Sequence, residues 1–162
     1  MSELKDLLLR APRWTLAVAE SITCGRVQAR VGLISGASEF FLGGITAYTL
    51  DQKVRHLGVD RAVAAACDCV SAEVAEQMAC GVGAMFGSHF GLATTGYAEP
   101  SAPRGVVHPF AWWALAEDLH NGQMAVRSGR VDCPGASRAV AQEMVADAAT
   151  AALLAYLRER RV

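Results

Sequence analysis

Two kinds of apolar pattern alternate along the chain. Leu4, Leu7 and Leu8 share one face of an expected amphipathic helix over residues 2–11. Short apolar runs predict strands over residues 14–19, 43–48 and 89–95. Helical spacing or helix-start signals predict further helices over residues 23–33, around residue 53, from residue 71 to about 86, and over residues 137–160.

The last strands differ from the earlier ones because a short turn joins them. Residues 105–116 and 123–133, connected through Asn121-Gly122, predict an antiparallel hairpin. The alternating helices and strands before it favour parallel pairing. We therefore expect a three-layer α/β/α sandwich with a mixed sheet, formed by residues 1–162 as a single domain without repeats or linkers.

Composition narrows the class of protein. Of the 162 residues, 52% are hydrophobic and 19% are charged, which argues against disorder. The formal net charge is −1, and the only basic cluster is in the tail at residues 158–161, so we expect no nucleic acid or membrane surface as a partner. The first residues are charged and amphipathic, and no apolar run is uninterrupted over the length of a bilayer. We expect a cytoplasmic protein.

The cysteines do not indicate a disulfide framework or a metal centre. Five of them form no C-x-x-C pair and leave an odd count, which favours free thiols in a cytoplasmic protein. Cys67-Asp68-Cys69 lacks the usual chelating spacing, so we expect no metal. Cys24 has two interpretations: a small residue in a position that suits glycine, or a reactive thiol at a helix N-terminus.

A hydroxyl, an amine and a phenol form the candidate chemistry. Ser21 stands between the strand at 14–19 and the helix expected from 23, and Tyr48 and Lys53 follow downstream. A serine is a weak nucleophile until a neighbour takes its proton, and a lysine can do so only when neutral. Tyr48 could relay a proton or hold the lysine. Thr23 and the backbone N–H groups near Gly25 would face a developing oxyanion.

Local signals place the lysine but leave simpler interpretations open. Thr49 and Gln52 have the spacing of a capping box, which puts Lys53 in the first turn of a short helix, where the helix dipole and burial lower the pKa of an amine. A serine after a strand is also a common helix N-cap, and most helical lysines are solvated.

The order of short motifs resembles one known family. Residues 19–25 read Ala-Glu-Ser-Ile-Thr-Cys-Gly, which is similar to the A-E-S-C-T-G-G signature of the C-terminal domain of the competence/damage-inducible protein CinA, the nicotinamide mononucleotide amidohydrolase family. Further similar motifs follow in register at residues 36–38, 41–44, 48–53, 54–59, 70–75 and 95–100. They cover nearly the whole chain.

The resemblance implies a reaction and a set of site residues. It implies hydrolysis of the carboxamide of nicotinamide mononucleotide to nicotinate mononucleotide and ammonia, with a small-molecule nucleotide as substrate, without a metal or other cofactor, in a homo-oligomer. The catalytic residues it implies are Ser21, Tyr48 and Lys53. The substrate-binding residues that we assign on this basis are Thr23, Gly25, Gly44, Thr95, Gly96 and Arg138.

Several positions depart from the family pattern. A family glycine becomes Cys24, the G-P-G-G loop begins with Glu99, and a late motif that carries two arginines has Ser137 and Ala141 in their places. Glycines let a backbone approach a ligand, and arginines bind phosphate in a fork. The departures predict an altered ligand pocket and weak binding of nicotinamide mononucleotide. They leave two alternatives: a non-catalytic nucleotide-binding member, or an amidase for another small amide.

Overall fold

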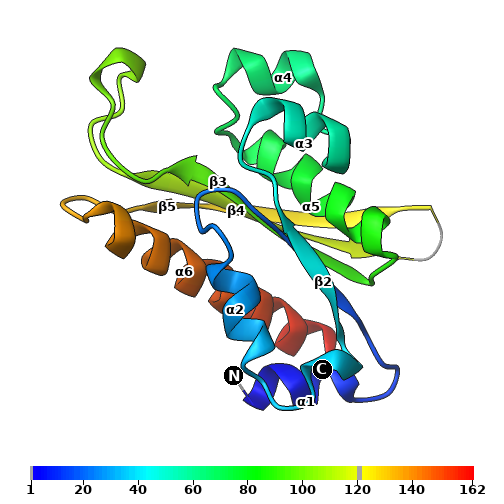
Figure 1. The fold of residues 1–162 in the computed structure, drawn as a ribbon. Coiled ribbons are helices and arrows are strands. Elements are labelled where there is room, and N and C mark those ends of the chain that lie inside the picture. Colours follow the sequence, from blue (N-terminus) through cyan, green and yellow to red (C-terminus); the bar gives the residue numbers. More distant parts are fainter. Residues whose placement is uncertain (1, 120–121) are drawn as a thin grey trace.

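A mixed five-stranded sheet runs through the centre of the molecule (Figure 1). The computed structural model describes residues 2–119 and 122–162. Within them the strand order is β2-β1-β3-β4-β5. The strands are β1 (Leu16–Glu20), β2 (Phe41–Thr46), β3 (Phe90–Tyr97), β4 (Phe110–Asp118) and β5 (Met124–Asp132). β1 pairs in parallel with β2 and β3, and β4 is antiparallel to β3 and β5.

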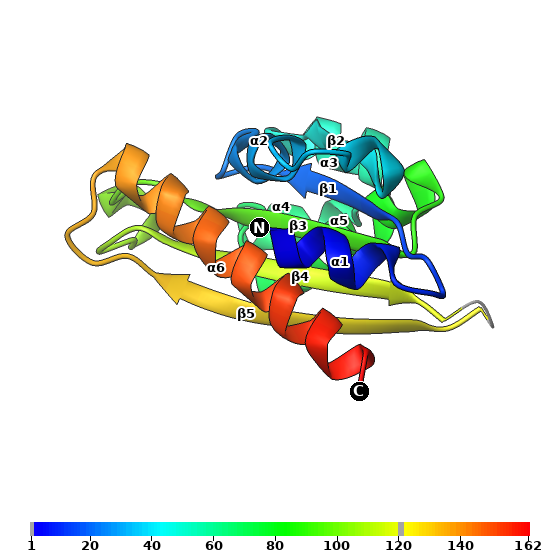
Figure 2. The ribbon, with the colours of Figure 1, turned by 90° about the horizontal axis from the view of Figure 1, so that it is seen from below.

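Helices cover both faces of the sheet, so the expected three-layer α/β/α architecture with a mixed sheet is confirmed (Figures 1 and 2). α3, α4 and α5 lie on one side, and α1, α2 and α6 lie on the other. The helices are α1 (Ser2–Leu9), α2 (Arg26–Gly32), α3 (Leu50–Leu57), α4 (Arg61–Ala66), α5 (Ala72–Phe86) and α6 (Arg138–Arg160). Short 3₁₀ turns occur at Ala37–Glu39 and Ala102–Arg104.

β1 illustrates why the chain folds into layers. A strand with both faces covered needs apolar residues at consecutive positions. Leu16 and Val18 pack into the core beneath α1, α2 and α6, whereas Ala17 and Ala19 pack beneath α5. The small residues on the second face let α5 approach the sheet closely. At Gly91 of β3 a Cβ atom would lie only 2.0 Å from the carbonyl oxygen of Ala79, so this contact requires glycine.

The hairpin begins later than the sequence pattern predicts. β4 begins at Phe110 because the preceding residues form a separate turn, in which Ser101 and Val106 exchange backbone hydrogen bonds and Gly105 adopts a left-handed conformation. Asn121 of the predicted turn lies outside the described residues. The helix α4 was not anticipated, because its six residues are too few to show a clear period.

α6 is the helix that bears on the expectation that no uninterrupted apolar run is long enough to span a bilayer. Among the described residues it is one helix whose length and composition would permit a crossing. Half of its apolar stretch is buried within the domain. Ala146, Ala149 and Leu153 pack into the core together with Phe90 and Leu92 of β3, which identifies α6 as a core helix of this fold.

Candidate active site

Ser21 lies immediately after β1, in a tight turn that leads to α2. Its N–H donates to the carbonyl oxygen of Thr94 on β3 at 3.0 Å, and its own carbonyl accepts from the N–H of Cys24 at 3.2 Å. Cys24 and Gly25 then adopt consecutive left-handed conformations, with φ of 48° and 94°. This geometry supports the interpretation of Cys24 as a residue in a position that suits glycine.

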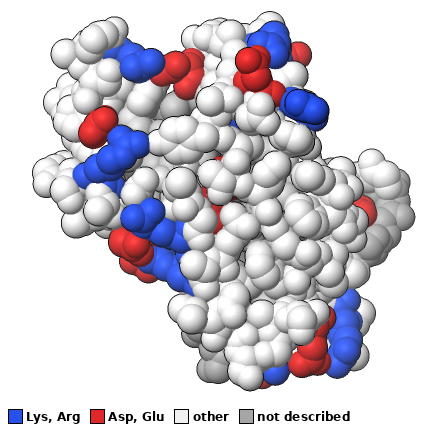
Figure 3. All heavy atoms as spheres, in the orientation of Figure 1, with Lys and Arg blue, Asp and Glu red and all other residues white. Residues whose placement is uncertain are grey.

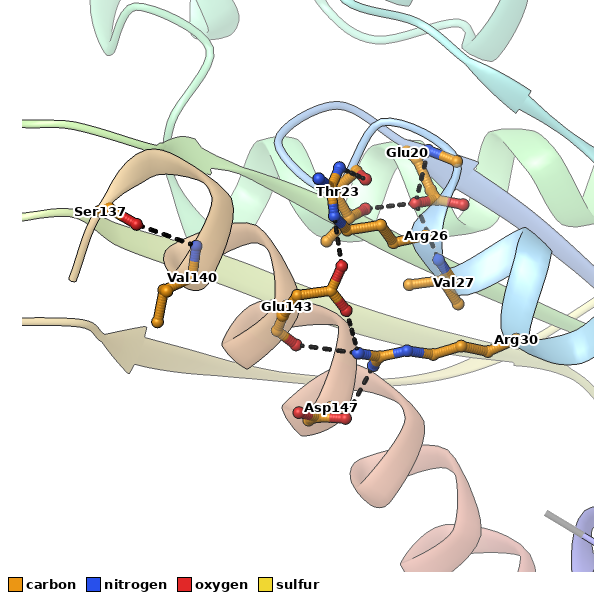
Figure 4. Close-up of polar contacts among 10 residues, drawn as sticks. Glu20, Thr23, Arg26, Val27, Arg30, Ser137, Val140, Glu143 and Asp147 are labelled. Atoms are coloured by element: carbon orange, nitrogen blue, oxygen red, sulfur yellow. Dashed lines mark hydrogen bonds and ion pairs between the residues drawn. The ribbon is translucent and has the colours of Figure 1, made fainter.

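The carboxylate of Glu20 fixes the same turn (Figure 4). It is fully buried, and its Oε2 accepts hydrogen bonds from the N–H groups of Gly25 at 2.9 Å and Val27 at 3.1 Å and from the hydroxyl of Thr23 at 2.5 Å. Its Oε1 accepts from the N–H of Gln28 at 2.8 Å. The carboxylate thus satisfies the free N–H groups and the positive end of α2.

This network corrects one expectation. Thr23 and the N–H of Gly25 were expected to face an oxyanion, but the structure directs both to Glu20. The Thr23 hydroxyl also lies 2.8 Å from that of Thr94, and the Thr23 side chain is fully buried. Because the Glu20 carboxylate already accepts their hydrogen bonds, these groups stabilise the Ser21 turn.

Two arginines on α2 connect this turn to α6 (Figure 4). Arg26 Nε lies 2.7 Å from one carboxylate oxygen of Glu143, and Arg30 Nη2 lies 2.6 Å from the other. The hydrogen bond from Arg26, followed by that from Arg30, holds the pKa of the Glu143 carboxyl below its ordinary value. The contact joins the element that follows Ser21 to the helix that carries Arg138.

Lys53 reaches Ser21 from α3. It is in the first turn of the helix, as predicted, and only 1% of its surface is exposed. Its Nζ lies 3.0 Å from Ser21 Oγ, 2.9 Å from the carbonyl oxygen of Ala47 and 3.2 Å from that of Tyr48. The three contacts hold the amine at the end of β1.

The capping box predicted for α3 does not form. Thr49 is the N-cap residue, but its side chain makes no capping hydrogen bond. The side chain of Gln52 lies 3.0 Å from His56 Nε2, one turn further along the helix. The position of Lys53 therefore depends on its own buried contacts rather than on a capping box.

Burial lowers the pKa of Lys53 below that of a free lysine, against smaller opposing effects of Cys69 and Asp68. A neutral amine has two N–H donors and one lone pair. The carbonyl oxygens of Ala47 and Tyr48 are acceptors only, so they take the two N–H groups, and the lone pair is left for the hydroxyl of Ser21. The geometry therefore suits proton transfer from Ser21 to Lys53.

Tyr48 holds the lysine through its backbone rather than its phenol. The side chain is 49% exposed, and its hydroxyl oxygen accepts a hydrogen bond from Arg138 Nη2 at 2.7 Å. The sequence prediction gave the phenol of Tyr48 the task of holding the lysine or relaying its proton, whereas in the structure the backbone carbonyl oxygen makes the contact with Lys53. The phenol lies with Arg138 in the cavity wall.

A cavity of about 430 Å³ opens above Ser21 and Lys53. Six of the nine site residues predicted from the sequence line it, namely Ser21, Tyr48, Lys53, Thr95, Gly96 and Arg138. The Thr95 hydroxyl donates to the carbonyl oxygen of Cys69 at 2.7 Å, which ties β3 to the α4–α5 connection. The carboxyl ends of β1 and β3 meet at this edge, where ligands bind in open α/β sheets.

Thr23, Gly25 and Gly44 are not brought into the cavity lining. Packing within the sheet explains Gly44, because a Cβ atom there would lie 2.5 Å from the carbonyl oxygen of Val18. The close contact between β1 and β2 therefore requires glycine at this position.

Sequence reasoning did not assign several residues of the cavity wall. Asp68 and Cys69 follow α4 and line the cavity. Both have left-handed backbone conformations, with φ of 50° and 63° respectively. Asp68 forms an ion pair with Arg104 and accepts a hydrogen bond from the hydroxyl of Tyr97 at 3.0 Å. Burial, together with this contact, raises the pKa of Tyr97 to about 12. The position of Tyr97 directly after Thr95-Gly96 was the available signal.

The described part of the chain shows no set of side chains placed to bind a metal ion. Within residues 2–119 and 122–162, no group of three or more His, Cys, Asp or Glu side chains is arranged to hold a metal ion.

Comparison with known proteins gives one consistent family. The profile of the CinA C-terminal domain family matches residues 1–157. A CinA-like protein from Chlorobium limicola is 36% identical over 147 residues, which is 90% of this chain and 34% of that protein. A CinA-like protein from Frankia casuarinae is 46% identical over 98 residues, which is 58% of this chain and 23% of that protein. The chain spans about a quarter to a third of the length of these curated relatives.

Solved structures share the fold over nearly the whole chain. A competence-damaged protein (CinA) superfamily protein from Klebsiella pneumoniae superimposes with a TM-score of 0.84 at 23% identity, covering 98% of this chain and 95% of that one. A CinA superfamily protein from Enterobacter cloacae gives a TM-score of 0.85 at 23% identity, with coverage of 96% and 88%.

Proposed function

Because this chain belongs to the CinA C-terminal domain family, we propose that it is a serine/lysine amidohydrolase that releases ammonia from a small carboxamide. Nicotinamide mononucleotide is the substrate that the family resemblance implies, with nicotinate mononucleotide as the product. The observation that carries the proposal is the 3.0 Å contact between Lys53 Nζ and Ser21 Oγ at the base of the cavity.

The first half of the reaction forms an ester. Neutral Lys53 takes the hydroxyl proton of Ser21 as Oγ attacks the carboxamide carbon. The tetrahedral intermediate then collapses, the C–N bond breaks, and the ammonium form of Lys53 returns the proton to the departing nitrogen. Ammonia leaves, and Lys53 is neutral again.

The second half hydrolyses the ester. Lys53 takes a proton from water, the resulting hydroxide attacks the acyl carbon, and the Ser21 ester bond breaks as Lys53 returns the proton to Oγ. The products are a carboxylic acid and the free enzyme. The carbonyl oxygens of Ala47 and Tyr48 hold the amine through both halves of the reaction. They accept hydrogen bonds from two N–H groups of Lys53, and neither of these carries the proton that is transferred.

Burial of Lys53 supports this assignment of the base. Only 1% of the residue is exposed, and burial lowers the pKa of the amine, which increases its neutral fraction near neutral pH. Tyr48, Thr95, Gly96 and Arg138 line the space in which the rest of the substrate would bind.

A second candidate is an amidase for another small amide. It is favoured by the 3.1 Å contact between Arg138 and Glu99, since Arg138 is one of the two arginines that line the cavity and already has an acidic partner. Both candidates use the same Ser21 and Lys53 chemistry.

Ammonia release from a panel of amides tests the proposal. The panel contains nicotinamide mononucleotide, nicotinamide riboside, nicotinamide and unrelated small amides, and each is assayed with the wild-type chain and a Ser21→Ala variant prepared identically. Release by wild type and loss in the variant supports the proposal. Absence of release from every amide, with folded protein verified by circular dichroism, contradicts it and leaves a non-catalytic nucleotide-binding role.

A further inference from the structure

The cavity carries its own counterions. Besides Lys53, its charged lining residues are two arginines and two carboxylates, Arg104, Arg138, Asp68 and Glu99. Arg138 Nη1 lies 3.1 Å from Glu99 Oε1, and Arg104 forms an ion pair with Asp68. Each cation that a phosphate could bind is therefore already paired with an acid of the same chain.

The nearby helix N-terminus is occupied in the same way. The N-terminus of α2, which follows Ser21, holds the Glu20 carboxylate through three backbone N–H groups. Helix N-termini commonly bind phosphate, but here a buried side chain takes that place (Figure 4). On the face of the molecule shown in Figure 3, basic and acidic side chains lie beside one another in small groups, mostly near the edges.

Glu99 is the acid that a phosphate bound to Arg138 would lie beside. It is 64% exposed and its partner Arg138 is 48% exposed, so the pair lies at the open side of the cavity. A phosphate dianion that reached Arg138 would compete for its N–H donors and bring two further negative charges beside the Glu99 carboxylate. A ligand without a phosphate leaves the pair intact.

We infer that Glu99 makes this cavity select carboxamides that lack a phosphate group, such as a pyridine nucleoside amide, over the corresponding nucleotide. The inference rests on the proposed amidohydrolase function of the same site. The two tyrosines Tyr48 and Tyr97 complete a wall that suits an uncharged or cationic ring, because aromatic rings attract positive charge.

The ratio of kcat/KM for the two substrates tests the inference directly. We expect the wild-type kcat/KM for ammonia release to be about tenfold higher for nicotinamide riboside than for nicotinamide mononucleotide. Glu99→Gln keeps the shape of the side chain and removes its charge, so it should shift the ratio about tenfold toward the mononucleotide. Glu159→Gln is the matched control, because Glu159 also pairs with an arginine, Arg127, but does not line the cavity. It should leave the ratio unchanged.

A binding arm separates this inference from the proposed function. Calorimetry on Ser21→Ala, with and without Glu99→Gln, compares the affinities of nicotinamide mononucleotide and nicotinamide riboside without turnover. Tighter mononucleotide binding in the double variant supports the inference even if no amide is hydrolysed. A wild-type preference for the mononucleotide overturns it. An unchanged ratio in Glu99→Gln, or binding of neither ligand by either variant, also overturns it.

Discussion

The carboxylate of Glu20 accepts a hydrogen bond from the N–H of Gly25 at 2.9 Å across the turn that presents Ser21. The residue before the proposed nucleophile thus fixes the backbone that follows it. Glu20 is not among the residues that line the cavity, and we expect its effect on the reaction to be exerted through the position of Ser21. Its role is therefore one of positioning.

Glu20→Gln should destabilise the fold and weaken catalysis together. The amide has one acceptor oxygen where the carboxylate uses two, and its NH₂ group would face N–H donors of α2. We expect a loss of about 3 kcal/mol in the free energy of unfolding, measured with urea. Glu39→Gln, which removes a half-exposed surface carboxylate, should change stability by less than about 0.5 kcal/mol. Equal effects of the two variants would contradict the positioning role.

Tyr48→Phe should reduce kcat by less than about tenfold, because the contact with Lys53 comes from the backbone carbonyl, which the substitution keeps. The effect should appear mainly in KM, since the lost hydroxyl holds Arg138 in the cavity wall. Tyr97→Phe, at the second tyrosine of the cavity, is the control. A fall in kcat of several orders of magnitude specific to Tyr48→Phe would show that the phenol itself transfers a proton.

Stability should depend on pH through Lys53. Its pKa is lowered in the folded protein, so the unfolded chain binds more protons between that pKa and the ordinary lysine value of 10.5. Stability from this group is therefore present at high pH and lost as pH falls through the folded pKa. The unfolding free energy of wild type minus that of Lys53→Met should rise with pH in this window, by at most about 1.4 kcal/mol per pH unit. A difference that is constant from pH 6 to 10 would show that the amine is not perturbed.

Cys24→Gly should be tolerated. Cys24 is exposed and has a φ of 48°, a conformation that glycine adopts more readily. We expect unchanged or slightly increased stability, by up to about 1 kcal/mol, and activity within twofold of wild type. Ammonia-release and urea-unfolding measurements on the same preparation check both. Loss of activity with stability retained would show that the thiol takes part in the reaction.

The layers and the nucleophile position could be predicted because both depend on local patterns. Residues 16–19 of β1 are an unbroken apolar run, and a hydroxyl shortly after such a strand lies at the edge of the sheet. Lys53 also had a local signal, because the spacing of Thr49 and Gln52 predicted the start of a helix there, and Thr49 is the N-cap residue even though no capping box forms. The sequence therefore supported both members of the proposed dyad.

The remainder of the site depends on contacts between distant segments. The pairing of Glu99 with Arg138 joins a loop to a helix 39 positions later, and nothing local to either residue indicates it. The roles of Thr23 and Gly25 could not be read correctly because the acceptor, Glu20, looks like the last residue of a strand, whose side chain could point in either direction. Only the fold shows that its carboxylate turns back onto α2.

The pH dependence of ammonia release from the best amide of the panel, from pH 6 to 9.5, tests the serine/lysine dyad most directly. If neutral Lys53 accepts the proton of Ser21, log kcat should rise by about one per pH unit and level off above the lowered pKa of Lys53. Ser21→Ala and Lys53→Met should each lose roughly 10³-fold or more of kcat, and Lys53→Arg should not restore it because guanidinium stays charged. A flat wild-type profile, together with Lys53→Met activity within tenfold of wild type, would contradict the account.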